Sequence, residues 1–350
     1  MSGPRQNNRI LITLAAFVVV VAGMRAAEPL LTPFLLSALI AMICTPPLFW
    51  LQHKNVPTSL AVLIVVCGVM VIGLLLATFV GSSLNDFATA APAYQARLQE
   101  ETISLFAWLD NFGINVSNQI LIEYFDPAKA LQMIAASLKQ LGSVLTNTFL
   151  ILLTVIFILL EASSFPAKLR AALEDPESTL PRFAQISASV KNYLSIKTVF
   201  SLITGLLVTV WLLILDVDFP VLWGLVAFLL NYVPNIGSII AAVPAILLAF
   251  VQFGLSRALI VAAGYVAINI IIGSILEPRY MGRGLGLSTL VVFVSLVFWG
   301  WVLGPIGMLL SVLLTMMIKI AMESHEETRW IGVLLGSNSA ETAPKTQADS

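Results

Sequence analysis

The sequence predicts an all-α fold, a polytopic transmembrane helical bundle. Of the 350 residues, 59% are hydrophobic and only 11% are charged, whereas a soluble domain carries about a quarter charged residues. The charged residues are also unevenly spread, because long stretches contain no Asp, Glu, Lys or Arg. Backbone groups in lipid must pair within their own segment, so each stretch is expected to be a helix.

Eight charge-free runs define about eight membrane segments, since a helix crosses the hydrocarbon layer with roughly 20 residues. The runs are Ile10–Met24, Pro29–Gln52, Asn55–Asn85, Gln140–Leu160, Thr198–Leu215, Phe219–Ser256, Ala258–Leu276 and Gly284–Ile318. Arg5 and Arg9 precede the first run as in a signal peptide, but the immediate second run favours an uncleaved helix. We therefore assign residues 1–81 to the first transmembrane helices and residues 140–322 to a transmembrane transport core.

Two polar stretches interrupt the runs. Residues 82–139 carry six acidic and three basic residues, and Asp126-Pro127 is a typical helix start; we predict a small helical extracytoplasmic domain. In the second stretch, apolar residues recur at helical spacing after Asp175-Pro176. An amphipathic helix along the cytoplasmic membrane surface is predicted near residues 176–197. The polar residues 323–350 are predicted to form a disordered cytoplasmic tail.

Basic residues in short loops mark the cytoplasmic side of a membrane protein. Arg5 and Arg9 place the N-terminus in the cytoplasm, and Lys54 follows two spans later. The acidic stretch 82–139 then lies outside and the basic stretch inside. Both termini are predicted to be cytoplasmic.

The two longest runs are too long to be single straight spans. Phe219–Ser256 has 38 residues, about 57 Å as one helix at 1.5 Å per residue. Proline and glycine interrupt each run near its middle, at "NYVPNIGS" (231–238) and "WVLGPIGM" (301–308). Hairpins or half-helices, which place Arg279 and Arg283 inside, are favoured by the charge rule. Broken full spans, which place both arginines outside, remain the alternative.

The sequence offers no enzyme motif. "MGRGLGLST" resembles a phosphate-binding loop but lacks its lysine. No Ser–His–Asp arrangement, HExxH motif or Cys/His cluster is present, and the net charge of −1 argues against a nucleic-acid partner. We expect a secondary transporter, facilitator or channel that is not an enzyme and uses neither a cofactor nor a metal.

A matched pair of Pro/Gly-interrupted apolar segments is the best sequence pointer to a transporter's binding site. Unwound backbone at such breaks exposes carbonyl and amide groups, which would line a cavity that suits a small, polar, largely neutral solute. Alternatively, both breaks could be dry turns packed by small residues. Pro278 is expected to end the preceding helix at Leu276. Glu161 and Arg283 are secondary candidates, with surface anchoring as their alternative. The primary candidates for the solute or ion path are Asn231, Pro234, Asn235, Gly237, Asn269, Glu277, Pro278, Arg279, Gly304 and Pro305.

Three segments resemble the AI-2E family, the autoinducer-2 exporters. They are "SVKNYLSIKT" (189–198), "NYVPNIGSIIAAVPAI" (231–246) and "ILEPRYMGRGLGLSTLVVFVSLVFWGWVLGPIGMLLSV" (275–312). The family's PxIG element falls on Pro234, Ile236 and Gly237, and its EPxxMG element on Glu277, Pro278, Met281 and Gly282. The chain departs from the family at Leu313, where relatives often have proline.

The resemblance implies a multi-pass protein of the bacterial inner membrane that exports autoinducer-2, a small hydroxylated furanone-type signal of quorum sensing and biofilm formation. It also implies a homo-oligomer in the lipid bilayer. Some members resemble sodium (or lithium)/proton antiporters, for which Glu277 or Glu161 would be the cycling carboxylate. A membrane scaffold whose 82–139 domain binds a partner is a third reading. Passive and ion-coupled transport both remain open.

Overall fold

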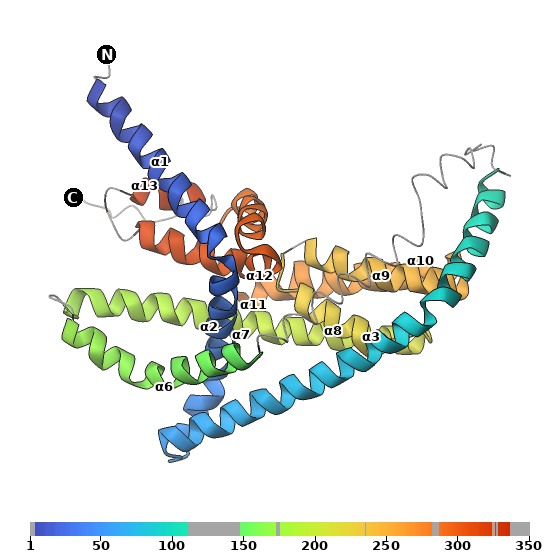
Figure 1. The fold of residues 1–350 in the computed structure, drawn as a ribbon, viewed down its shortest axis with the longest axis horizontal. Coiled ribbons are helices and arrows are strands. Elements are labelled where there is room, and N and C mark those ends of the chain that lie inside the picture. The colour runs from blue at the N-terminus through green and yellow to red at the C-terminus, as the bar shows by residue number, and fades with distance from the viewer. Residues whose placement is uncertain are drawn as a thin grey trace, which may run out of the picture. The chain divides into compact units, whose positions relative to one another are not determined.

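The computed structural model describes residues 4–110, 148–172, 176–234, 236–281, 287–323, 326 and 328–336. All regular secondary structure within these residues is helical, apart from one isolated β-bridge between Leu287 and Gly336 (Figure 1). The helices are α1 (Pro4–Ala26), α2 (Glu28–His53), α3 (Thr58–Asp110), α6 (Thr148–Ala172), α7 (Pro176–Ile214), α8 (Pro220–Leu230), α9 (Ile236–Phe253), α10 (Leu255–Ile268), the π-helix η2 (Asn269–Leu276), α11 (Glu277–Met281), α12 (Thr289–Glu323) and α13 (Arg329–Leu335).

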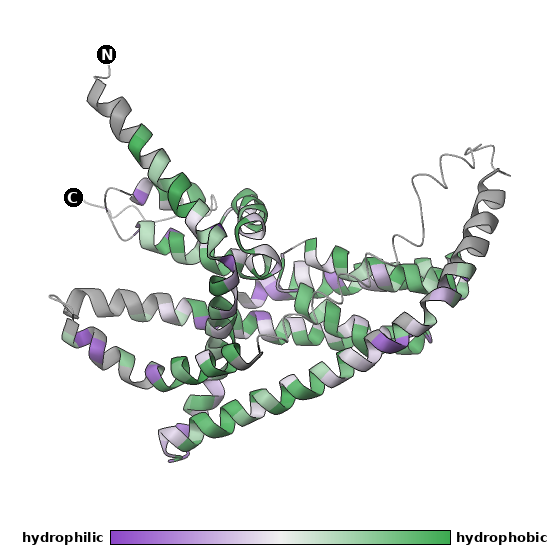
Figure 2. Cartoon of the chain, viewed as in Figure 1, coloured by the Kyte–Doolittle hydropathy of each residue, from purple (hydrophilic) through white to green (hydrophobic). Residues whose placement is uncertain are grey.

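The helical membrane fold is confirmed, but the number of spans differs from the prediction. Hydrophobic residues, drawn in green, predominate along the coloured helices (Figure 2). Within the described residues, six helical segments are long and apolar enough to cross a membrane, instead of about eight. Three further apolar helical segments of the described residues are shorter than these six. These are Ala15–Ala26, Leu150–Ala162 and Pro220–Leu230.

The chain forms two compact units, whose boundaries fall inside α2, α6, α7 and α11. The first unit consists of residues 1–45, 154–194 and 281–350. Its core joins α2, the first part of α7 and α12 through buried residues such as Leu39, Leu194 and Val312. A second cluster packs Val21 of α1 against Trp299 of α12.

The second unit, residues 46–153 and 195–280, contains the first Pro/Gly break. Its core is built around Trp223 of α8, which is 1% exposed, together with Phe87 of α3 and Leu212 of α7. Helices α8, α9 and α10 form successive contacts, and α3 packs on α9. This arrangement supports the α8–α9 turn from several sides.

Both predicted breaks are present. The chain turns at residues 231–234, between α8 and α9, which are in contact. In α12, Gly304 has φ 64° and ψ −153°, and Pro305 begins the second half of the helix. Ser295 Oγ lies 2.9 Å from the Ser311 carbonyl oxygen, whereas 16 residues of straight helix would span about 24 Å. The favoured folded-back form is therefore observed for both segments.

Three predicted boundaries differ from the observed ones. Helix α3 continues without interruption from the apolar run to Asp110, so the helical part of the 82–139 region extends the span; residues 111–139 lie outside the described residues. Helix α7 begins at Pro176 as predicted, but continues to Ile214. The tail is helical at α13, which packs on α12 with Gly332 buried against Glu323.

Pro278 does not end its helix, contrary to the prediction. The chain continues from the π-helix η2 into α11, with Pro278 at the second position of α11. The Glu277 N–H donates to the Ile272 carbonyl, five residues earlier. A π-turn is wider than an α-turn, and this local change accommodates the missing proline N–H and its ring.

Candidate functional site

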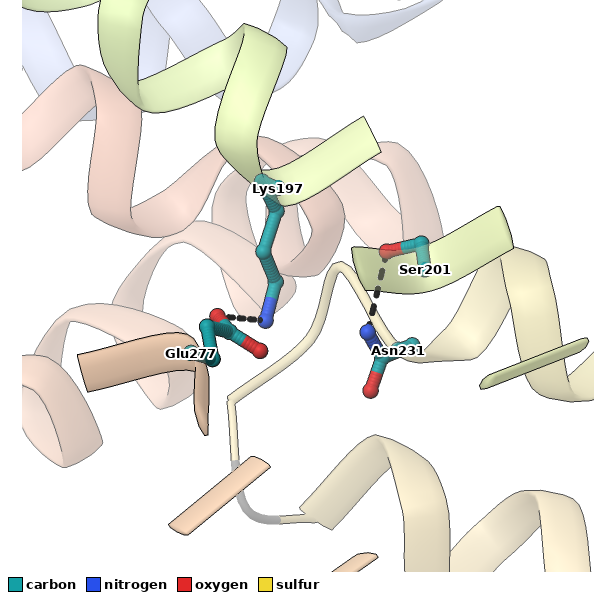
Figure 3. Close-up of polar contacts among 4 residues, drawn as sticks. All are labelled: Lys197, Ser201, Asn231 and Glu277. Carbon is teal, nitrogen blue, oxygen red and sulfur yellow. Dashed lines mark hydrogen bonds and ion pairs between the residues drawn. The ribbon is translucent and has the colours of Figure 1, made fainter. Parts of the chain in front are cut away.

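A buried ion pair lies at the centre of the candidate site. Lys197 Nζ donates to Glu277 Oε1 at 2.5 Å, and the two residues are 5% and 7% exposed. The lysine comes from the middle of α7 and the glutamate from the junction of η2 and α11 (Figure 3). Two opposite charges removed from water require each other, because an unpaired buried charge is very costly.

The first Pro/Gly break contributes neutral polar groups beside this pair. Asn231 Nδ2 donates to Ser201 Oγ at 2.9 Å, and both residues are buried (Figure 3). The neighbouring Tyr232 hydroxyl donates to Thr198 Oγ1 at 2.8 Å. Because Lys197 and Ser201 are four residues apart on α7, they lie on one face of the helix. The ion pair and the break therefore belong to one polar site.

Gly237 makes the break possible. A Cβ at this position would collide with the Leu230 carbonyl oxygen, because the chain reverses there within a few residues. The Gly237 N–H donates to the Val233 carbonyl, and the Ile236 N–H donates to the Pro234 carbonyl. These bonds satisfy backbone groups that a buried turn would otherwise leave unpaired.

A small cavity lies further along the same face of α7. Its volume is about 10 Å³, and it is lined by residues of α7, α8, α9, α10 and η2. Asn269, a predicted path residue, lines it at the start of η2. The lining residues are Thr204, Val208, Ala227, Ser238, Ala241, Tyr265, Ile268 and Asn269.

The predicted path residues fall into three groups. Asn231 and Glu277 meet the same face of α7, and Pro234 and Gly237 shape the turn next to them. Pro278 and Arg279 are exposed, so the carboxylate of Glu277 and the guanidinium of Arg279 have different surroundings although they are two residues apart. Asn235, Arg283 and Gly282 lie outside the described residues.

Gly304, Pro305 and Glu161 belong to the other unit. Gly304 takes the left-handed conformation that glycine permits, and Pro305 is exposed. The two halves of α12 pack through hydrogen bonds: Thr315 Oγ1 accepts from Trp299 Nε1 at 3.0 Å and pairs with Ser295 Oγ at 2.5 Å. Glu161 is exposed and pairs with Lys168 at 2.8 Å, as a surface residue does.

Lys197 is the residue that the sequence analysis missed. It stands at the end of the helix that was predicted to lie along the membrane surface near residues 176–197. A signal was available, because Lys197, Ser201 and Thr204 recur at helical spacing in an otherwise apolar segment. A polar stripe of this kind inside a span indicates a buried partner.

The chain is similar to known transport proteins over most of its length. The AI-2E family transporter model matches residues 14–327. The chain is 43% identical to the AI-2 transport protein TqsA of Escherichia coli (strain K12), over 93% of this chain and 95% of the relative. It is 38% identical to a putative transport protein of Haemophilus influenzae, over 95% and 98%. It is 36% identical to the putative transport protein YhhT of Escherichia coli (strain K12), over 93% and 94%.

The names of the family and these relatives indicate transport, which points away from an enzyme. The six long apolar helices are those of a multi-pass membrane protein. Together with the transporter relatives, they are consistent with a lipid bilayer and a small-solute substrate. This multi-pass protein belongs to the AI-2E family of transporters.

Proposed function

We propose that this protein exports autoinducer-2 across the bacterial inner membrane, with the Lys197–Glu277 pair and Asn231 as the polar groups that receive the solute. The single observation that carries the proposal is a buried ion pair, at 2.5 Å, beside a Pro/Gly break. The similarity to a relative named as an AI-2 transport protein supports the choice of solute. Both termini are proposed to be cytoplasmic, and the protein is proposed to act as a homo-oligomer.

The chemistry of the pair suits a neutral, hydroxylated solute. The lysine ammonium is a donor and the carboxylate an acceptor, so a hydroxyl can accept from one and donate to the other. The charges cancel, which means that the site does not need a charged cargo. Buried ion pairs contribute little net stability compared with apolar residues, so a role in recognition is a reason for its presence.

Passage requires the pair to separate. A solute hydroxyl that accepts from the ammonium and donates to the carboxylate compensates for the broken contact. An apolar molecule would leave both charges unpaired. The site thereby discriminates by the penalty that a wrong solute incurs, which is the stronger route to specificity. Asn231 adds a neutral amide that orients the solute without changing the net charge.

Uptake of labelled autoinducer-2 into inverted vesicles tests the proposal. Vesicles that contain the protein should accumulate the label faster than vesicles without it, and Glu277→Gln should abolish the difference. The same uptake with and without a pH gradient separates passive from proton-coupled transport. Equal uptake with and without the protein would contradict export of this solute.

A sodium/proton antiporter is the second candidate function. The observation that favours it is the burial of the Glu277 carboxylate, which is 7% exposed and whose charge Lys197 neutralises. Sodium and a proton would bind to the Glu277 carboxylate in turn, each in place of the lysine ammonium. Proteoliposomes should then show sodium-dependent proton movement that Glu277→Gln abolishes, in the absence of any organic solute.

A further inference from the structure

The cavity beyond the ion pair contains hydroxyl groups without partners. Within the described residues, Thr204 Oγ1 and Tyr265 Oη are buried and make no hydrogen bond. Each residue is 6% exposed, and both line the cavity. An unpaired buried hydroxyl is destabilising, so native proteins seldom leave two at the same place.

The size of the cavity fits one small ligand. Its volume of about 10 Å³ is near the lower limit for one water molecule, which also needs two to four polar partners. Thr204 and Tyr265 supply two hydroxyls, and Ser238 and Asn269 add polar side chains to the lining. The lining contains no charged residue, which favours a neutral ligand.

The position of the cavity connects it with the ion pair. Lys197, Ser201 and Thr204 are spaced i, i+4 and i+7 on α7, so they form one stripe. Val208, one turn further, also lines the cavity. Tyr265 and Asn269 line the cavity from the continuous helix formed by α10, η2 and α11. The same helix carries Glu277 near its C-terminal end.

We propose that this cavity is a binding site for a single hydroxyl group. In the resting protein the ligand is an ordered water molecule that joins Thr204 of α7 to Tyr265 of α10. During passage, a hydroxyl of the transported solute takes the place of the water; this second half rests on the proposed function. The ion pair and the cavity then receive hydroxyls of the solute one after the other, because Lys197 and Thr204 are seven residues apart on α7, about 10 Å along the helix axis.

Thermal stability in detergent tests the water, independently of transport. Thr204→Val and Tyr265→Phe keep the side-chain shape and remove one hydroxyl each. If a water joins the hydroxyls, each variant lowers the melting midpoint, and the double variant lowers it by less than the sum because both lose the same water. Tyr280→Phe, at an exposed position, is the control and should leave the midpoint unchanged.

Two results would overturn the water. If the cavity is dry, removing an unpaired hydroxyl leaves the midpoint unchanged or raises it. If the ligand is a cation, the midpoint of the parent protein rises when choline is replaced by sodium, and Thr204→Val removes the increase. The water site predicts the same midpoint in both salts.

Uptake of labelled autoinducer-2 into inverted vesicles tests the second half. Thr204→Val should raise the KM about tenfold, which corresponds to about 1.4 kcal/mol, and leave kcat near the parent value. An unchanged KM beside a lowered midpoint would keep the water and overturn the solute step. If the parent protein takes up no autoinducer-2, the solute step fails with the proposed function, and the midpoints still decide the water.

Discussion

The two Pro/Gly breaks look alike in the sequence but differ in their surroundings. At residues 231–238, the turn presents Asn231 to α7 next to a buried ion pair and a cavity. At residues 301–308, the two halves of α12 satisfy each other through Ser295, Trp299 and Thr315. A break therefore determines where the chain bends, while the neighbouring side chains determine whether polar groups are left for a ligand.

The largest expected effect is that of the glycine packed against a backbone carbonyl, which both breaks contain. A Cβ at Gly237 would collide with the Leu230 carbonyl, and one at Gly307 with the Trp299 carbonyl. Gly237→Ala and Gly307→Ala should each cost on the order of 3 kcal/mol, seen as loss of monodisperse protein in size-exclusion chromatography. Gly68→Ala is the control, because nothing lies within 4 Å of its Cβ position. Equal yields of all three variants would contradict the tight-turn account.

The next effect belongs to the first break alone. Lys197→Met leaves the Glu277 carboxylate buried without its partner, which should lower the stability by about 3–5 kcal/mol. Glu277→Gln should do the same by leaving the ammonium unpaired. Thermal melting of each variant against the parent protein measures the loss. A melting midpoint that does not change in either variant would show that the pair is not buried inside the protein.

A matched pair of smaller changes sharpens the comparison. Asn231→Leu removes the donor to Ser201 and should slow transport about tenfold, or about 1.4 kcal/mol. Thr315→Val removes the partner of Ser295 and Trp299 and should cost about 1–3 kcal/mol of stability with transport per folded protein unchanged. Melting and vesicle uptake of both variants separate the two. Equal losses of transport would mean that the second break is also part of the route.

The smallest expected effect is that of Arg279. Its side chain is exposed, although it lies two residues from the buried Glu277. Arg279→Gln should change stability by no more than about 0.5 kcal/mol and transport by no more than about twofold. A severe loss of uptake at normal expression would show that Arg279 is part of the site.

Much of the fold was predictable, because the positions of the helices and of their bends depend on nearby residues. Charge-free runs of sufficient length indicate the helices, and Pro and Gly within them indicate the bends. The turn at Pro234 and the bend at Gly304 follow from backbone chemistry alone. The helix through Pro278 was not predictable, because the preceding π-helix depends on packing. The partner of Glu277 was also hidden: Lys197 lies 80 residues earlier in the chain, and its basic neighbours suggested a membrane surface.

The most direct test replaces the ion pair by a neutral pair of similar shape. In Lys197→Met combined with Glu277→Met, no charge is left unpaired, so the melting midpoint should return close to the parent value. Uptake of labelled autoinducer-2 into inverted vesicles by the double variant should remain abolished, because the donor and acceptor for the solute are gone. Parent-like uptake by the well-folded double variant would show that the pair only supports the fold.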